Sequence, residues 1–156
     1  GVAPSPTDTS LINVGLKTFE IRMHKHAENA LAIAFWLQDQ PQIEAVLYPG
    51  LPDNPFHELA KRQMVNGFGG MVSFKIKGGV ENCMTFTNAV TIPTLAVSLG
   101  NVDSLIQHPA SMTHSATPKA EREKAGIADN IVRLSVGIEN IEDLIADLGQ
   151  AMAKVR

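Results

Sequence analysis

An arginine set into an apolar stretch near the end of the sequence has the clearest chemical use. In residues 131–139, strand alternation places Arg133 on the face opposite Val132 and Leu134. A guanidinium is costly to bury unpaired, so this position needs an anion or open water. Its planar fork matches a carboxylate through two parallel hydrogen bonds. Two interpretations follow: a structural ion pair with Asp or Glu, and a site for the carboxylate of a ligand.

Two further segments offer polar groups to a ligand. Ser98 precedes Gly100 at the end of an extended segment, where its hydroxyl and backbone amide can face a bound molecule. Taken alone, a turn-forming serine is the stronger interpretation. Residues 109–115 form a polar loop, and loops carry function more often than cores do, although a long connection also accounts for it.

Other residues that often do chemistry have structural interpretations here. The glycines of residues 67–70 come before a strand, whereas a phosphate-binding loop opens a helix, so they predict a tight turn. The five histidines have no partners at metal-ligand spacing, and we expect no metal site. Cys83 has no basic neighbour and is expected to be a buried thiol. No lysine, nucleophile or carboxylate pair is placed for catalysis, so we expect no catalytic residue in this sequence.

Composition narrows the class of protein. With 156 residues, 44% of them hydrophobic and 19% charged, the chain can bury a substantial core. The net charge of −3 and the lack of a basic block argue against nucleic-acid and membrane partners. A single cysteine, no apolar run of membrane-spanning length and no signal pattern predict a cytoplasmic protein.

The hydrophobic pattern predicts few strands among more numerous helices. Apolar residues run from Leu11 to Leu37, which predicts a long helix bridging two bodies of protein, with Gly15 or residues 24–26 as possible bends. Ser5 is placed to cap its start and Asn140 to cap the final helix. Further helices are predicted at 57–65, 80–89 and 119–124, strands at 43–48, 71–76 and 131–139, an extended segment at 90–99 and a loop at 100–118. Because no regular βαβ order appears, we predict an α+β fold with a small sheet and helices packed on it.

Several motifs lie in order along the chain: Tyr48-Pro49-Gly50-Leu51, His57-Glu58-Leu59-Ala60, Gly69-Gly70-Met71-Val72-Ser73-Phe74, Ser98-Leu99-Gly100, His108-Pro109-Ala110-Ser111-Met112-Thr113-His114 and Arg133-Leu134-Ser135-Val136-Gly137. Together they resemble the Cys/Met-metabolism family of pyridoxal-phosphate enzymes. The resemblance runs over essentially the whole chain.

This resemblance implies the small C-terminal domain of a fold-type I pyridoxal-phosphate enzyme. The sheet would be short and mostly antiparallel, with helices packed on it. Residues 1–40 would form a long helix region between domains, and residues 41–156 the α+β domain that grips the substrate. The large domain, with the cofactor lysine and the phosphate-binding residues, would lie upstream and outside this chain. The chain alone would then bind no pyridoxal phosphate and be inactive.

The resemblance also assigns roles to four residues. Arg133 corresponds to the arginine that holds the α-carboxylate of the substrate, which favours the ligand interpretation over the ion pair. Ser98 corresponds to a serine that contacts the substrate and the cofactor lysine, and Leu99 lies next to it. Thr113 corresponds to a threonine near the same carboxylate. The implied partners are a sulfur amino acid, the upstream cofactor domain and further copies of the protein, as a homotetramer in the family.

Within the family, the segment Ala96-Val97-Ser98-Leu99-Gly100-Asn101 departs from the Ala-Glu-Ser-Leu-Gly-Gly usual in cystathionine enzymes. Val97, together with residues 107–115, is closer to methionine γ-lyases. A carbon–sulfur lyase that eliminates methanethiol from methionine is therefore the first hypothesis. Cystathionine γ-lyase or γ-synthase and O-acetylhomoserine sulfhydrylase are alternatives, and a stand-alone binding or assembly module is the alternative from another class.

Overall fold

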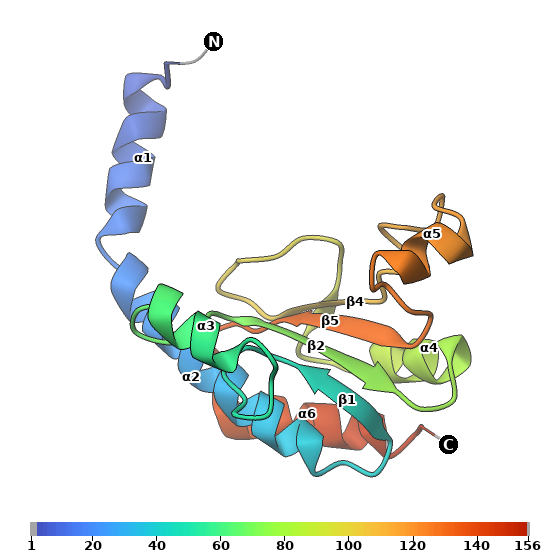
Figure 1. Ribbon diagram of the computed structural model, residues 1–156. Helices are drawn as coiled ribbons and strands as arrows, with labels where there is room; N and C mark the ends of the chain where they lie inside the picture. The colour runs from blue at the N-terminus through green and yellow to red at the C-terminus, as the bar shows by residue number, and fades with distance from the viewer. Residues whose placement is uncertain (1–2, 156) are drawn as a thin grey trace.

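A five-stranded mixed sheet lies at the centre of the computed structural model, which describes residues 3–155 (Figure 1). Its strands follow the order β1-β2-β5-β4-β3. The pairs β1–β2, β2–β5 and β4–β5 are antiparallel, and β3–β4 is parallel. The strands are β1 (Ile43–Leu47), β2 (Met71–Ile76), β3 (Thr94–Leu95), β4 (Leu105–Gln107) and β5 (Ile131–Ser135).

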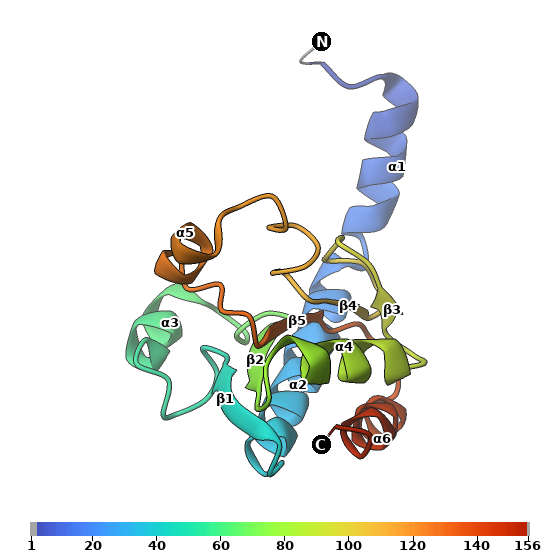
Figure 2. The same ribbon diagram turned by 90° about the vertical axis from the view of Figure 1, so that its right-hand side faces the viewer.

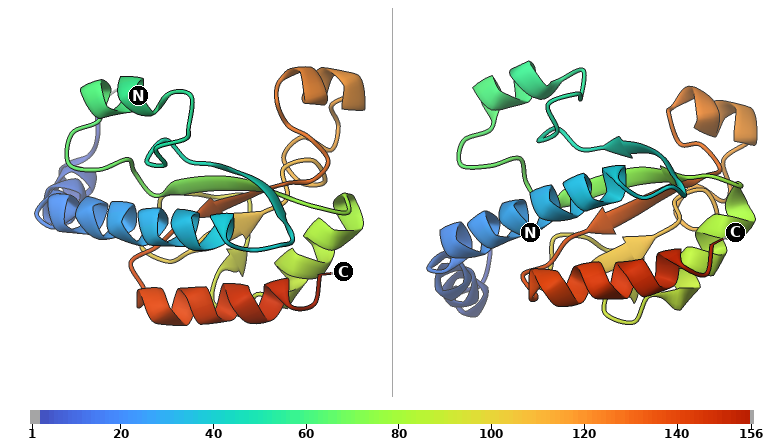
Figure 3. Two further views of the ribbon diagram at one scale, coloured as in Figure 1. Left: turned by 60° about the horizontal axis from the view of Figure 1, so that its bottom comes forward. Right: turned by 90° about the horizontal axis from the view of Figure 1, so that it is seen from below.

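Six helices are found in the described residues, which gives the predicted α+β class. Two of them, α2 and α6, lie side by side on one face of the sheet, and α4 packs against α6 (Figures 1 and 3). The helices are α1 (Pro6–Leu16), α2 (Phe19–Gln38), α3 (His57–Gln63), α4 (Val80–Ala89), α5 (Lys119–Lys124) and α6 (Ile141–Met152).

The core lies between the sheet and α2 and α6. Phe74 of β2 and Leu134 of β5 are fully buried, and so are Ile33 of α2 and Leu148 of α6. Because strand side chains alternate, the residues next to these in β2 and β5 face the other side of the sheet. That side carries α5 and the loop after β3, opposite α2 and α6 (Figure 2).

The predicted long helix is two helices. Its break lies at Lys17 and Thr18, and not at Gly15 or residues 24–26. Thr18 has φ −113° and ψ 6°, outside helical geometry, and a β-branched residue favours such a break. The two helices also differ in surroundings, since α1 buries no residue while α2 buries seven. α2 is therefore part of the packed body, and α1 projects from it (Figure 1).

Caps at both ends of the chain agree with the sequence. The Ser5 hydroxyl accepts a hydrogen bond from the backbone N–H of Asp8, and Asp8 completes a capping box. The side chain of Asn140 accepts a hydrogen bond from the N–H of Glu142. These contacts satisfy N–H groups that have no partner inside their helix.

The segment between α4 and α5 differs from the prediction. Of the extended residues 90–99, only Thr94–Leu95 is strand, and the predicted loop 100–118 contains β4. A three-residue strand shows too few alternations to be recognised in a sequence. β4 forms because it lies between β3 and β5, where Ile106 is fully buried.

Every helix in residues 3–155 is too short or too polar to cross a membrane.

We predict that the 156-residue chain self-associates when expressed alone. Leu11, Ile12, Val14 and Leu16 of α1 are each 57–67% exposed, so association would remove apolar surface from water. Replacing Leu11 and Val14 together by Lys should shift the mass measured by light scattering towards one chain. Replacing Thr9 and Asn13 together by Lys adds the same charge on the side of α1 opposite Leu11 and Val14 and should leave association unchanged. A monomeric wild-type chain at all concentrations would contradict the prediction.

A buried carboxylate predicts how stability depends on pH. Asp147 of α6 accepts hydrogen bonds from the N–H and hydroxyl of Thr91, the N–H of Ile92 and the amide of Gln150. Burial raises the pKa of Asp147, but these bonds lower it by more, so the pKa lies below its ordinary value. Such a group stabilises the fold above its unfolded pKa, and this contribution is lost as the pH falls through the folded pKa.

We therefore expect Asp147→Asn to lower the free energy of unfolding at neutral pH by about 2 kcal/mol, as loss of charged hydrogen bonds does. The difference from wild type should shrink below about pH 4, where the unfolded carboxyl is protonated. Urea unfolding of wild type and Asp147→Asn from neutral to acidic pH measures this difference in free energy. The exposed Asp39→Asn is the control. A difference that is independent of pH would contradict the assigned role.

Candidate functional site

Arg133 lies in the middle of the sheet, on the face away from α2 and α6. In β5 it stands opposite Ser73 of β2 on one side and Gln107 of β4 on the other. Its Nη2 donates to the carbonyl oxygen of Ser98 at 3.2 Å and to that of Val97 at 3.3 Å. The side chain is half-buried, and it forms no ion pair with any acid of the described residues.

The charge of Arg133 is thus only partly compensated. Burial lowers the pKa of Arg133 below its ordinary value, because a low-dielectric setting disfavours the charged form. Carbonyl oxygens accept hydrogen bonds but carry no negative charge. Within residues 3–155, Nε and Nη1 have no hydrogen-bond partner. Nε and Nη1 lie on different edges of the guanidinium, so each can donate a hydrogen bond to an anion, and a two-bond pairing with a carboxylate would also use an N–H of Nη2.

The loop of residues 96–104 between β3 and β4, here called the Ser98 loop, is held against β5 by a further hydrogen bond besides those from Arg133. The N–H of Gly100 donates to the Ser135 hydroxyl at 2.9 Å, and Gly100 has φ +79°, which glycine adopts most easily. Ser98 and Leu99 remain exposed on this loop. Leu99 also lines a small cavity of about 130 Å³ next to Ser135. Arg133 and Ser135 together fix the backbone that carries Ser98.

A cluster of hydrogen bonds joins the end of this loop to the segment that follows β5. Glu139 accepts hydrogen bonds from the N–H and the hydroxyl of Ser104 at 2.6 and 2.9 Å. The same hydroxyl accepts a bond from the N–H of Gly137 at 2.8 Å. Ser104 is fully buried and Gly137 is buried, so this cluster is a fixed part of the fold.

Helix α2 holds the same segment from the other side. Nδ1 of His26 donates to the carbonyl oxygen of Val136 at 2.6 Å, which fixes the tautomer. The amide of Asn29 donates to the carbonyl oxygens of Gly137 and Glu139 at 3.1 and 2.9 Å. The backbone that leaves β5 is thus bound by one turn of α2 and by the Ser104 loop.

Thr113 is not brought to Arg133 by any hydrogen bond in the described residues. It is exposed, and its hydroxyl bonds instead to Nδ1 of His114 at 2.8 Å. The start of its loop is fixed by His108, which is buried and pairs with the Ser111 hydroxyl and the carbonyl oxygen of Asp129. The predicted site residues therefore fall into two groups: Arg133 with Ser98 and Leu99, and Thr113 on a separate loop.

Sequence reasoning missed the residues that hold the site in place. Ser135, Ser104, Glu139 and His108 make the bonds described above, yet none of these bonds was predicted from the sequence. Only Ser135 gave a usable signal, because it lies two positions from Arg133 and so on the same strand face. The other three residues form hydrogen bonds between loops, and such bonds leave no periodic pattern in the sequence.

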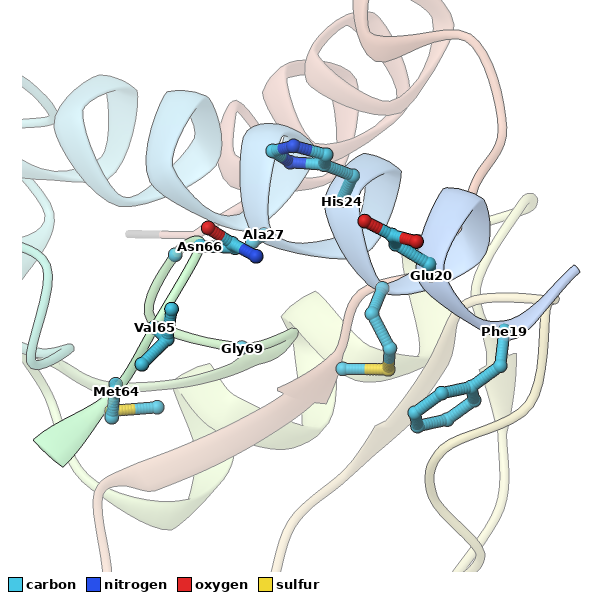
Figure 4. A pocket seen from close by; sticks show the side chains of 10 residues that line it. Phe19, Glu20, His24, Ala27, Met64, Val65, Asn66 and Gly69 are labelled. Carbon is cyan, nitrogen blue, oxygen red and sulfur yellow. The ribbon is translucent and has the colours of Figure 1, made fainter. Parts of the chain in front are cut away.

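A cavity of about 410 Å³ lies away from Arg133, between the start of α2 and the turn after α3 (Figure 4). Its lining is mostly apolar, with Glu20 and His24 as the ionisable side chains. Neither Arg133 nor Ser98 reaches it. This cavity is therefore separate from the surroundings of Arg133.

Cys83 and the side chains of metal-ligand type were the remaining candidates for chemistry in the sequence. Cys83 is buried, as predicted, and burial raises its pKa to about 11 against a smaller lowering by a backbone hydrogen bond at Ile76. In the described residues, no three His, Cys, Asp or Glu side chains are grouped to hold a metal ion.

The glycine-rich turn does not fit a phosphate group. Gly67 and Gly69 have positive φ, and the turn leads into β2 rather than into a helix, so no row of helix N–H groups faces an anion. The turn of residues 67–70 therefore leads into the sheet, as predicted from the sequence.

Comparison with known proteins adds a family match. Residues 1–153 match the model of the Cys/Met metabolism PLP-dependent enzymes. The chain is 54% identical over 155 residues to an L-methionine gamma-lyase of Fusobacterium nucleatum subsp. polymorphum, covering 99% of this chain and 39% of that protein. It is 52% identical over 152 residues to a cystathionine gamma-lyase of Bos taurus, covering 97% and 37%. The chain thus spans about two fifths of the length of these relatives.

We predict that Gly137→Ala loosens the Ser98 loop. An added Cβ would meet the Glu139 carboxylate, the carbonyl oxygen of Val102 and the backbone nitrogen of Ser104, two of which are backbone atoms. The loop must then move, which should lower the free energy of unfolding by about 1–3 kcal/mol. Hydrogen exchange of the Gly100 amide should become faster.

Gly15→Ala is the control for this substitution. Nothing lies within 4 Å of the added Cβ in α1, and alanine favours a helix by up to about 1 kcal/mol. Equal stability and equal exchange for Gly137→Ala and wild type would show that the close approach at Gly137 is not required.

Proposed function

Because this chain belongs to the Cys/Met-metabolism family of pyridoxal-phosphate-dependent enzymes, we propose that it supplies the substrate-carboxylate site of a carbon–sulfur lyase. The observation that carries this proposal is the guanidinium of Arg133. It is half-buried and has no acidic partner in residues 3–155, and two of its donors are unused beside the Ser98 loop.

In this proposal Arg133 orients an amino acid by its α-carboxylate. The carboxylate would accept hydrogen bonds from the N–H donors of the guanidinium that have no partner, while the Ser98 and Val97 carbonyl oxygens hold Nη2. Ser98 and Leu99 are exposed next to this position, so they are the residues that the substrate would contact. Thr113 would contribute only if its loop approaches Arg133 in the assembled enzyme.

The cofactor would be held by residues outside this chain. Bound pyridoxal phosphate serves as an electron sink for carbanions, so the parent enzyme would need it for bond cleavage. We assign residues 1–40 to the region that connects the cofactor domain with the α+β domain of residues 41–156. Support comes from α1, which buries no residue of its own and exposes apolar side chains. The same surface supports a homo-oligomeric parent.

Methionine is the proposed substrate, with release of methanethiol, 2-oxobutanoate and ammonia. Support comes from the Fusobacterium relative and from Val97, a neutral side chain exposed beside Ser98. Cystathionine is the second candidate, since the bovine relative is nearly as similar. Assaying the full-length protein for methanethiol from methionine and for cysteine from cystathionine distinguishes the two. A full-length protein with no visible absorption band and neither activity would instead support a non-catalytic module.

We expect Arg133→Ala in the full-length protein to raise the KM for the amino-acid substrate about 10- to 100-fold, because charged hydrogen bonds to the carboxylate are lost. Steady-state kinetics measures this change. Arg62→Ala, at the exposed end of α3, is the control and should leave KM unchanged. An unchanged KM and kcat for Arg133→Ala would rule out the proposed carboxylate site.

A further inference from the structure

Gln107 is the direct neighbour of Arg133 in β4. The two residues are register partners in the antiparallel β4–β5 pair, so both side chains point to the sheet face away from α2 and α6. Partners in such a pair have Cβ atoms roughly 5 Å apart, within the combined reach of a glutamine and an arginine. Gln107 is 2% exposed.

The side chain of Gln107 has an unused acceptor. Its Oε1 is buried and has no hydrogen-bond partner in residues 3–155. A buried amide oxygen without a partner is unfavourable, because it has lost water and gained nothing in return. Arg133 on the next strand has donors without acceptors, since its Nε and Nη1 have no hydrogen-bond partner in residues 3–155. An unpaired acceptor and unpaired donors are thus adjacent on one face.

We propose that Gln107 is a positioning residue for Arg133, and that its Oε1 accepts a hydrogen bond from the guanidinium when a carboxylate binds. Arg133 is held on one side by the Val97 and Ser98 carbonyl oxygens. A bond from the opposite strand fixes the plane of the guanidinium, so that the N–H groups left without a partner are held in one orientation for the carboxylate. As a neutral acceptor, Gln107 does this without cancelling the charge that the carboxylate needs. This inference rests on the proposed function of Arg133.

The test uses the full-length protein and two inhibitors. L-Norleucine carries an α-carboxylate, and n-pentylamine is the same molecule without it. Gln107→Met keeps the side-chain length and removes the acceptor, whereas Gln107→Glu keeps an acceptor but adds a charge that competes for Arg133. The chain offers a matched control in Gln42, whose Oε1 is likewise buried and unpaired but which lies next to Met152 at the end of α6.

We expect Gln107→Met to weaken the inhibition constant of L-norleucine about tenfold, in keeping with one lost hydrogen bond to a charged group. The constant for n-pentylamine should stay within about twofold, because Arg133 acts on the carboxylate alone. Gln107→Glu should weaken L-norleucine further, and Gln42→Met should change neither constant. With substrate, Gln107→Met should raise KM and leave kcat nearly unchanged, a split that general loss of stability would not produce.

The possible outcomes separate this inference from the proposed function. If Arg133→Ala weakens L-norleucine while both Gln107 variants bind it as wild type does, the positioning role is wrong and the carboxylate site stands. If Arg133→Ala also binds as wild type does, both are wrong. If Gln107→Met does not fold, Gln107→Leu, which also removes the acceptor, is measured in its place against the same two inhibitors. Equal weakening of both inhibitors by the Gln107 variants would indicate a structural role and would overturn the inference.

Discussion

The main constraint on this structure is the free-energy cost of partly burying the charged guanidinium of Arg133 on one face of the sheet. Arg133 is half-buried between Ser73 and Gln107 in neighbouring strands, with uncharged carbonyl oxygens as its only partners in residues 3–155. These carbonyl oxygens can face Arg133 because the backbone that carries them is held in place. The Gly100–Ser135 bond and the Glu139–Ser104–Gly137 cluster provide that rigidity. The loop is therefore ordered by the strand that carries the charge.

Sequence periodicity predicted the parts of the fold that repeat. β2 and α4 have the predicted bounds, and so does α5, because each shows a regular pattern between clear turn residues. The break at Thr18 was misplaced, since a single residue outside helical geometry leaves no periodic signal. β4 was missed because its three residues are strand only through pairing with neighbours distant in sequence.

A residue of the candidate site could be predicted from the sequence only where a side chain of clear chemical use also interrupts the regular hydrophobic pattern. Arg133 was visible because a charge interrupts an apolar alternation, and Ser98 indeed lies beside it. Thr113 was assigned by resemblance alone, and its hydroxyl bonds to its neighbour His114 instead. The residues that support the loop, such as Glu139 and Ser104, are 35 positions apart and meet only in the folded chain. No local pattern can report such a contact.

The hydrogen bonds from α2 to the backbone after β5 connect two parts of the chain that are far apart in the sequence. His26 and Asn29 bind three successive parts of that backbone, at Val136, Gly137 and Glu139. α2 is a continuous helix from Phe19 to Gln38, so the turn that carries His26 and Asn29 belongs to the same rigid element as its exposed beginning. The backbone after β5 is thereby anchored to a helix that starts directly after the break at Thr18.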